Sequence, residues 1–149
     1  VHQPLYPLRA ERDTSVLASE IRPVLQRHRV DLVLQGHDHT YGRRADAAAA
    51  LPQYISSVAG PKQYRLSPEA RATMKPTAED TQLFQVLRLD DKGLRYEART
   101  ATGRLYDAFR ISRSAAGDKQ FSEITEGRIP QRDCPRAVSP KGRDDRCWE

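Results

Sequence analysis

The 149-residue sequence predicts an α/β fold built around one hydrophobic core. An amphipathic helix pattern is followed directly by a short apolar run, which is the alternation expected of an α/β domain. Further along, three strand-like segments follow one another at short spacing and predict an antiparallel meander. With 38% apolar and 30% charged residues, the chain is long enough for one compact domain and too short for two well-packed ones.

The first predicted element is a helix over Ser15–Arg27. Its apolar residues recur at the spacing of one helix face: Leu17, Ile21, Val24 and Leu25. Thr14 or Asp13 could cap the start, and we expect Pro23 either to kink the helix or to begin a second short one. His28 then falls at the helix C-terminus, where an imidazolium interacts well with the helix dipole, so we expect a structural role for it.

The following segments predict strands. The apolar run from Val30 to Leu34 ends at Gly36 and predicts a buried strand, and the stretch from Tyr54 to Ala59 predicts another. The segment 62–80 contains two prolines and few large apolar residues, so it predicts a long surface excursion. The meander strands are then expected over Leu83–Leu89, Leu94–Thr100 and Leu105–Ile111, joined by turns that contain glycine.

The composition changes after residue 113. We therefore expect a first region over residues 1–113 and a basic, cysteine-containing extension over residues 114–149. Cys134 and Cys147 are close enough in sequence to close a short loop, and a disulfide between them would suit a segment with little apolar content. Two unrelated free thiols remain the alternative.

Charge and composition exclude little by themselves. The formal net charge is +5, mostly from arginine, which favours contact with phosphate. The arginines are spread along the chain without a dense block, and no nucleic-acid-binding motif is present, so we do not expect a nucleic acid partner. No apolar run approaches the roughly 18 residues of a membrane-spanning helix, so we expect no membrane contact. The sequence begins at Val1 and not at a methionine, so we expect it to be part of a longer protein.

The strongest local signal is the segment Gly36-His37-Asp38-His39-Thr40-Tyr41-Gly42-Arg43, which begins where the buried strand ends. Two imidazoles at i and i+2 can both project into a cleft at the end of an α/β sheet and bind a metal ion. By spacing alone, the pair could equally be surface residues. We expect Gly36 to allow a close backbone approach or a positive φ.

A second segment, His2-Gln3-Pro4-Leu5-Tyr6, lies one helix and one strand upstream. In this order the two segments resemble the H-x-P-x-Y and G-H-x-H-x-Y-x-R motifs of the calcineurin-like metallophosphoesterase superfamily, in its purple-acid-phosphatase-like branch. Segments 54–62 and 94–107 are also similar to strands of bacterial members. The resemblance covers residues 1–113 and implies the C-terminal half of an α/β/β/α sandwich, with a mixed sheet and a C-terminal antiparallel meander.

The resemblance also implies a function: hydrolysis of a phosphate ester by metal-activated hydroxide at a centre of two metal ions, such as Fe, Zn or Mn. His2 and His37 would bind the second ion and His39 the first. The substrate would be a phosphorylated small molecule or ester. Because many members of the branch are exported, we expect a periplasmic or secreted location.

Four neighbouring residues have open roles. Asp38 could accept a hydrogen bond from an imidazole or be a solvated loop residue. Tyr6 and Tyr41 could line the cleft and touch substrate, or pack with a satisfied hydroxyl. Arg43 could contact phosphate or hold the loop through a salt bridge.

Three segments of the family pattern do not occur in this sequence: D-x-H, the G-D-x-x-[DY] segment with the bridging carboxylate, and G-N-H-[DE]. Three histidines divided between two ions cannot hold such a centre. We therefore expect the missing N-terminal half of the domain to be a partner, and the chain alone to be catalytically poor. The alternative function is that of a non-catalytic truncated or degenerate fragment.

Overall fold

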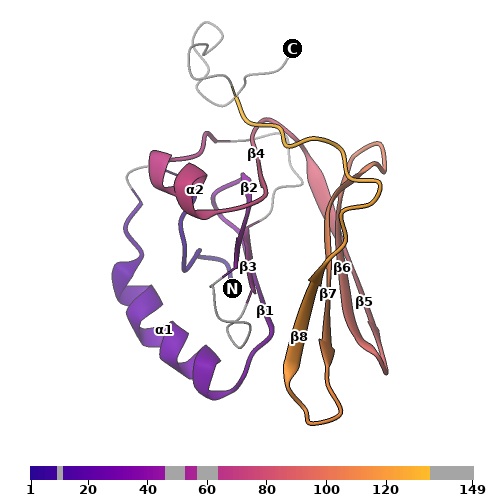
Figure 1. Ribbon diagram of the computed structural model, residues 1–149. Helices are drawn as coiled ribbons and strands as arrows, with labels where there is room; N and C mark the ends of the chain where they lie inside the picture. The colour runs from indigo at the N-terminus through magenta and orange to yellow at the C-terminus, as the bar shows by residue number, and fades with distance from the viewer. Residues whose placement is uncertain (10–11, 46–52, 57–63, 135–149) are drawn as a thin grey trace, which may run out of the picture.

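The computed structural model describes residues 1–9, 12–45, 53–56 and 64–134. In chain order the elements are α1 (Ser15–Arg27), β1 (Leu32–Gln35), β2 (Tyr41–Ala45), β3 (Gln53–Ser56), α2 (Pro68–Thr73), β4 (Thr77–Ala78), β5 (Leu83–Asp90), β6 (Gly93–Thr100), β7 (Leu105–Arg113) and β8 (Lys119–Glu123). Figure 1 shows two sheets face to face, with both helices on the side of the first sheet. The predicted α/β class is confirmed, with one mixed sheet and one antiparallel meander.

The first sheet has the strand order β1-β3-β2-β4. β1 and β3 are parallel, whereas β2 runs antiparallel to both β3 and β4. Alternate residues of β1 and β3 face opposite sides: Val33 and Tyr54 pack toward α1, and Leu32 and Ile55 pack toward the second sheet. Because both faces are covered, these short strands are apolar on both sides, as expected of buried strands.

The helix α1 covers the outer face of this sheet with three of the four side chains that the periodicity predicted, while the fourth, Val24, is 43% exposed. Leu17, Ile21 and Leu25 pack against Leu5, Val33 and Tyr54. The predicted helix over residues 15–27 is confirmed, and it stays continuous through Pro23 where a kink or a second helix was expected. The N-cap is Thr14, without a side-chain cap, while Asp13 accepts a hydrogen bond from the Ser15 amide. His28 is the C-cap, as predicted.

The second sheet is the predicted meander, with strand order β5-β6-β7-β8. The pairing extends past residue 113, because β8 pairs with β7 from Arg113↔Lys119 to Phe109↔Glu123. Residues 114–134 therefore continue the packing of residues 1–113, while residues 135–149 of the expected extension lie outside the described residues.

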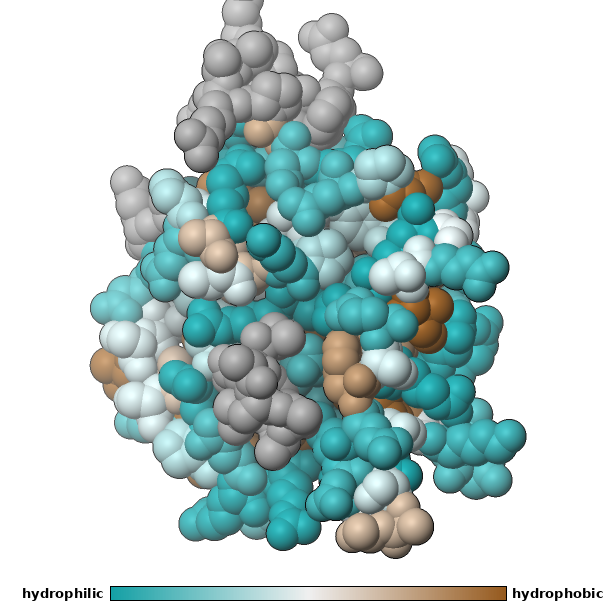
Figure 2. Space-filling model, viewed as in Figure 1, coloured by the Kyte–Doolittle hydropathy of each residue, from teal (hydrophilic) through white to brown (hydrophobic). Residues whose placement is uncertain are grey.

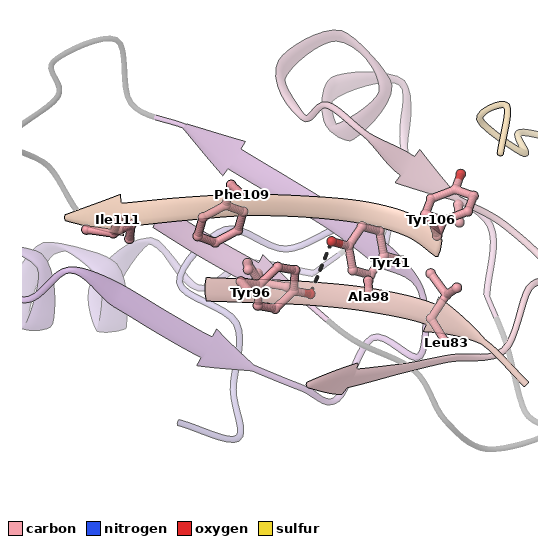
Figure 3. Packing of buried hydrophobic residues seen from close by; sticks show 9 residues of the cluster. Tyr41, Leu83, Tyr96, Ala98, Tyr106, Phe109 and Ile111 are labelled. Carbon is pink, nitrogen blue, oxygen red and sulfur yellow. Dashed lines mark hydrogen bonds between the residues drawn. The ribbon is translucent and has the colours of Figure 1, made fainter. Parts of the chain in front are cut away.

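The two sheets enclose one aromatic core. Tyr41, Ile55 and Ala78 of the first sheet pack against Tyr96, Phe109 and their neighbours in the second. Figure 3 shows Tyr41 and Tyr96 with their hydroxyl groups together, 3.1 Å apart, and Phe109 lies beside Tyr96 with its ring stacked at 4.7 Å. Burial of these large side chains provides most of the hydrophobic stabilisation of the contact between the sheets.

The segment 62–80 was predicted to be a surface excursion, and this is wrong for its described part. It forms α2 and β4, and Leu66, Ala70 and Met74 pack with Leu8 in a second small core. The Glu79 carboxylate is fully buried and accepts hydrogen bonds from the amides of Leu66 and Cys134. The prediction of a surface excursion was based on the prolines at residues 68 and 76. Pro68 does not prevent a helix here, because it begins α2 and proline is well accommodated in the first turn of a helix.

The view in Figure 2 shows a mostly hydrophilic surface with small, separate hydrophobic patches on the side of the second sheet. Phe84, Leu87 and Leu89 of β5 are among the exposed large apolar side chains. None of the helices in the described ranges combines the length and the apolar character that crossing a membrane requires.

Candidate metal centre

The two histidine segments meet at the carboxyl end of β1. The amide of Gly36 donates to the carbonyl of His2 at 3.1 Å, so the N-terminal segment runs beside the loop that follows β1. This is the end of a parallel strand pair at which α/β folds place their ligands. The prediction that the two segments share one site is therefore supported by their position.

The loop after β1 makes a sharp backbone turn at its two histidines. His37 and His39 have φ values of 70° and 48°, in the left-handed region that non-glycine residues rarely adopt. Gly36 has an ordinary φ, and a Cβ there would meet the His2 carbonyl at an unstrained 3.6 Å. Both expectations for Gly36 are therefore wrong. The residues with an unusual backbone conformation are the candidate ligands themselves, and backbone strain of this kind is often found at functional sites.

His2 and His37 are in direct contact. Nδ1 of His37 lies 3.0 Å from Nε2 of His2, and the rings are arranged edge to face with centroids 4.9 Å apart. Two imidazole nitrogens at this separation can donate to one metal ion with bonds of about 2 Å each. The predicted pairing of these two residues as ligands of one ion therefore fits the geometry.

The electrostatics favour neutral imidazole. Loss of hydration lowers the pKa of His37 below its ordinary value of 6.5, and the positive charge of Arg12 and the neighbouring His2 lower it further. Asp38 acts in the opposite direction. Because only the neutral ring has a lone pair for a metal ion, His37 is in its ligating form at neutral pH.

His39, predicted as a ligand of the other metal ion, lies on the same loop as His37. Its ring packs edge to face against Tyr64 with centroids 6.0 Å apart. In the part of the chain that the structure describes, no group of three or more His, Cys, Asp or Glu side chains is placed to hold a metal ion. The described donor set thus fits one half of a metal site, the His2–His37 pair, and does not complete a two-metal centre.

Asp38 is neither a partner of the imidazoles nor a solvated loop residue. It is fully buried, and its Oδ2 accepts hydrogen bonds from the amides of Leu8 at 2.7 Å and Arg9 at 3.2 Å. Its Oδ1 lies 2.6 Å from Nε of Arg12. Asp38 therefore holds Leu8, Arg9 and the side chain of Arg12 against the histidine loop.

This attachment places two guanidinium groups at the histidines. Arg9 lies over the ring of Tyr64, 4.1 Å from its centroid, and Tyr64 in turn contacts His39. Arg12 is near enough to His37 to lower its pKa. A cleft of about 560 Å³ adjoins Arg12 and is lined also by Gln3 and by the first turns of α1. Neither arginine was a predicted site residue, because their placement depends on Asp38 at long range.

Gln35 also escaped prediction. This buried side chain accepts a hydrogen bond from the Leu5 amide and donates to the Tyr6 carbonyl and to Ser56. A glutamine within an otherwise apolar strand was the available signal, since a buried amide must find partners. It holds the segment that contains His2 against β1.

Tyr6 lies beside the site without facing its histidines. Its ring is covered by Arg44 at 4.2 Å and Arg22 at 5.1 Å, and it meets Tyr54 edge to face at 4.7 Å. Of the two roles considered for this residue, packing is the one supported by these contacts.

Tyr41 and Arg43 point from β2 away from the histidines and into the space between the sheets. Arg43 is 3% exposed and binds Asp107 through Nε at 2.8 Å, while the Tyr41 hydroxyl donates to the same carboxylate at 2.7 Å. Burial raises the pKa of Tyr41 well above 10. The structure thus shows the salt-bridge role for Arg43 and the packing role for Tyr41, and it excludes both from a cleft at the histidines.

Cys134 is buried at the end of the described chain. Its predicted partner Cys147 lies outside the described residues, so the disulfide stays a prediction.

No family model matches this chain, and no curated protein matches it. Its fold is similar to that of a solved Plasmodium structure described as GAP50, the anchor in the inner membrane complex. The TM-score is 0.63 at 21% sequence identity, and the match covers 74% of this chain and 34% of that one. The chain thus spans about a third of the length of this neighbour. At this identity the match supports the fold and no particular function.

Proposed function

We propose that this chain is the C-terminal part of a metal-dependent phosphoesterase domain and supplies imidazole ligands to its metal centre. The observation that supports this most directly is the contact of His2 with His37 at 3.0 Å, made by two segments 35 residues apart that meet at the end of a parallel strand. A purple-acid-phosphatase-like site requires these two segments to converge.

In this proposal the described residues hold and orient the ligands. Gln35 anchors the segment of His2 through the Leu5 amide, and Asp38, between the two histidines of the loop, accepts from the amides of Leu8 and Arg9. Arg12 places positive charge near His37, and Arg9 lies over Tyr64, which contacts His39. In this proposal the two guanidinium groups would attract the oxygens of a phosphoryl group.

Bound metal ions would supply a hydroxide near neutral pH and stabilise charge on the phosphoryl group. The remaining ligands, including a bridging carboxylate, would come from the missing N-terminal half of the domain. The chain by itself is therefore expected to bind metal weakly and to hydrolyse phosphate esters poorly. A periplasmic or secreted location remains part of this proposal and rests on the family resemblance alone.

Zinc titration of this chain, followed by calorimetry, tests the ligand pair. We expect one weak site, and we expect His37→Ala to raise its Kd by at least about tenfold, because loss of one of two nitrogen donors removes most of the coordination. The matched control is His28→Ala, which removes an exposed imidazole at the end of α1. Equal loss in both variants, or no saturable binding to the unmodified chain, contradicts the proposal.

A second candidate is a non-catalytic binding module. The incomplete donor set among the described residues favours it. The two candidates differ in one measurement: addition of the missing N-terminal half should restore phosphatase activity that depends on His37 only in the first.

A further inference from the structure

The outer face of the second sheet contains an unusual concentration of arginine. β6 alternates strictly, with Leu94, Tyr96 and Ala98 facing the core and Arg95, Glu97 and Arg99 facing outward. This alternation is typical of a sheet with one solvated face. In Figure 1 the helices α1 and α2 lie on the far side of the first sheet, away from this face.

Three guanidinium groups on this face converge on the carboxylate of Glu97. Nε of Arg95 and Nε of Arg99 each donate to it at 2.8 Å, and an amino nitrogen of Arg88 lies 3.4 Å away. Arg88 belongs to β5 and stands directly opposite Arg95 in the strand pairing. The strand register, and not the local sequence, therefore brings the third arginine to the group.

The cluster has more positive charge than its own carboxylate can balance. One negative charge faces three positive ones, and Glu97 is only 2% exposed, so it lies beneath the arginines. The arginines themselves are accessible, with Arg88 exposed by 62%, Arg95 by 36% and Arg99 by 33%. Two positive charges around Glu97 are thus left without a negative partner in the cluster and face solvent.

Glu97 gives the arginines a defined geometry. It accepts hydrogen bonds from Nε of Arg95 and Nε of Arg99, and Arg99 is held further by an amino nitrogen 2.8 Å from the same carboxylate and by donation of its other amino group to the Gly103 carbonyl at 2.8 Å. The amino groups of Arg95 still carry donor hydrogens for a second anion, and Arg99 contributes mainly its fixed positive charge. A second anion above Glu97 would meet side chains that are already ordered, so little conformational entropy would be lost on binding. A tetrahedral dianion offers several oxygens to such a fork and matches the excess charge.

We propose that Arg88, Arg95 and Arg99, held by Glu97, form a binding site for a phosphate group on the outer face of the second sheet. This site is independent of the histidines, which lie at the end of β1 in the other sheet. Phe84 stands directly opposite Arg99 and is 42% exposed, so an aromatic ring attached to the phosphate would have a surface to lie on.

The test is calorimetric titration of the metal-free chain with inorganic phosphate. We expect saturable binding of one equivalent, and we expect Arg88→Gln/Arg95→Gln to raise the Kd by at least about tenfold through loss of charge-assisted hydrogen bonds. The control Arg27→Gln/Arg29→Gln removes the same charge from exposed positions at the end of α1 and should leave the Kd within about twofold. Adenosine monophosphate as a second probe distinguishes the source: tighter binding that is lost in Phe84→Ser indicates an organic phosphate, and equal affinity indicates free phosphate.

Non-saturating binding, or an equal loss in the control, would overturn the proposal because it would show only general attraction to a basic protein. The single variant Arg88→Gln should fold normally, because Arg88 is the most exposed of the three arginines and makes the longest contact with Glu97. It therefore tests the site even if the double variant does not fold. An unchanged Kd in a folded Arg88→Gln/Arg95→Gln protein would also overturn it. Because the histidines are intact in all these variants, the result is separate from that of the zinc titration.

Discussion

At the scale of single residues, Glu97 couples the stability of the protein to pH. Burial by itself raises the pKa of this carboxyl, but the hydrogen bonds and charges of Arg95 and Arg99 outweigh it and hold the pKa below its ordinary value of 4.5. A carboxyl with a lowered pKa in the folded state stabilises that state above its unfolded pKa. The stabilisation is lost as the pH falls through the folded value.

This predicts that Glu97→Gln lowers the free energy of unfolding by about 1 kcal/mol at pH 6, an amount reduced by the partial exposure of the arginines. The difference between the two proteins should shrink as the pH falls below 4.5 and through the lowered pKa of folded Glu97, because below that pKa both proteins carry a neutral side chain. Urea denaturation over a series of pH values from 6 downward measures it, with Glu126→Gln as the exposed control. A difference that stays constant with pH would show that ionic contacts of Glu97 do not stabilise the fold.

At the scale of elements, the packing of β2 against α2 depends on a glycine. A Cβ at Gly42 would lie 2.6 Å from Cδ2 of Leu8 and 2.8 Å from the sulfur of Met74. Both distances are below van der Waals contact, so the strand can approach the second small core only without a side chain at this position.

We therefore predict that Gly42→Ala lowers the free energy of unfolding by about 1–3 kcal/mol, because an overpacked core must shift. Thermal unfolding followed by circular dichroism measures the change. The double substitution Gly42→Ala/Met74→Ala removes the Met74 sulfur from the contact with the new Cβ. It should therefore cost less than the sum of the two single changes. Simple additivity would show that the two residues do not press on each other.

The elements also show where local patterns were sufficient. The helix α1 and the strands β5 to β7 were predicted close to their observed bounds, because each has a clear period of apolar residues. β2, α2, β4 and β8 were not predicted. Tyr41–Ala45 alternates poorly, and α2 has six residues, so neither has a periodic signal long enough to recognise.

At the scale of the whole molecule, one buried carboxylate joins the two sheets. Asp107 of β7 is fully buried and binds Tyr41 and Arg43 of β2, while Arg128 lies 3.0 Å away on its other side. Removal of the Asp107 charge would leave the buried Arg43 with the partly exposed Glu123 as its remaining carboxylate, and the buried part of the network would lose its compensation.

Asp107→Asn should therefore lower the free energy of unfolding by about 3–5 kcal/mol. Near-ultraviolet circular dichroism reports the tyrosines between the sheets and should show the transition together with the far-ultraviolet signal, if the sheets unfold as one unit. Asp118→Asn, in the exposed turn before β8, is the control and should change stability by less than about 0.5 kcal/mol. A small effect of Asp107→Asn would mean that the apolar core alone holds the sheets together.

The sequence by itself determined the features that depend on neighbours along the chain: the amphipathic helix, the meander with its glycine turns, and the two histidine segments as the most informative motifs. Only the tertiary structure decided which side chains meet. It brought His2 to His37, joined Asp38 to the amides of Leu8 and Arg9, and turned Tyr41 and Arg43 into the core. It also set the register that places Arg88 beside Arg95. The physical reason is range, because periodicity records how one segment divides its faces, whereas contacts between distant segments depend on packing and strand pairing that no local pattern specifies.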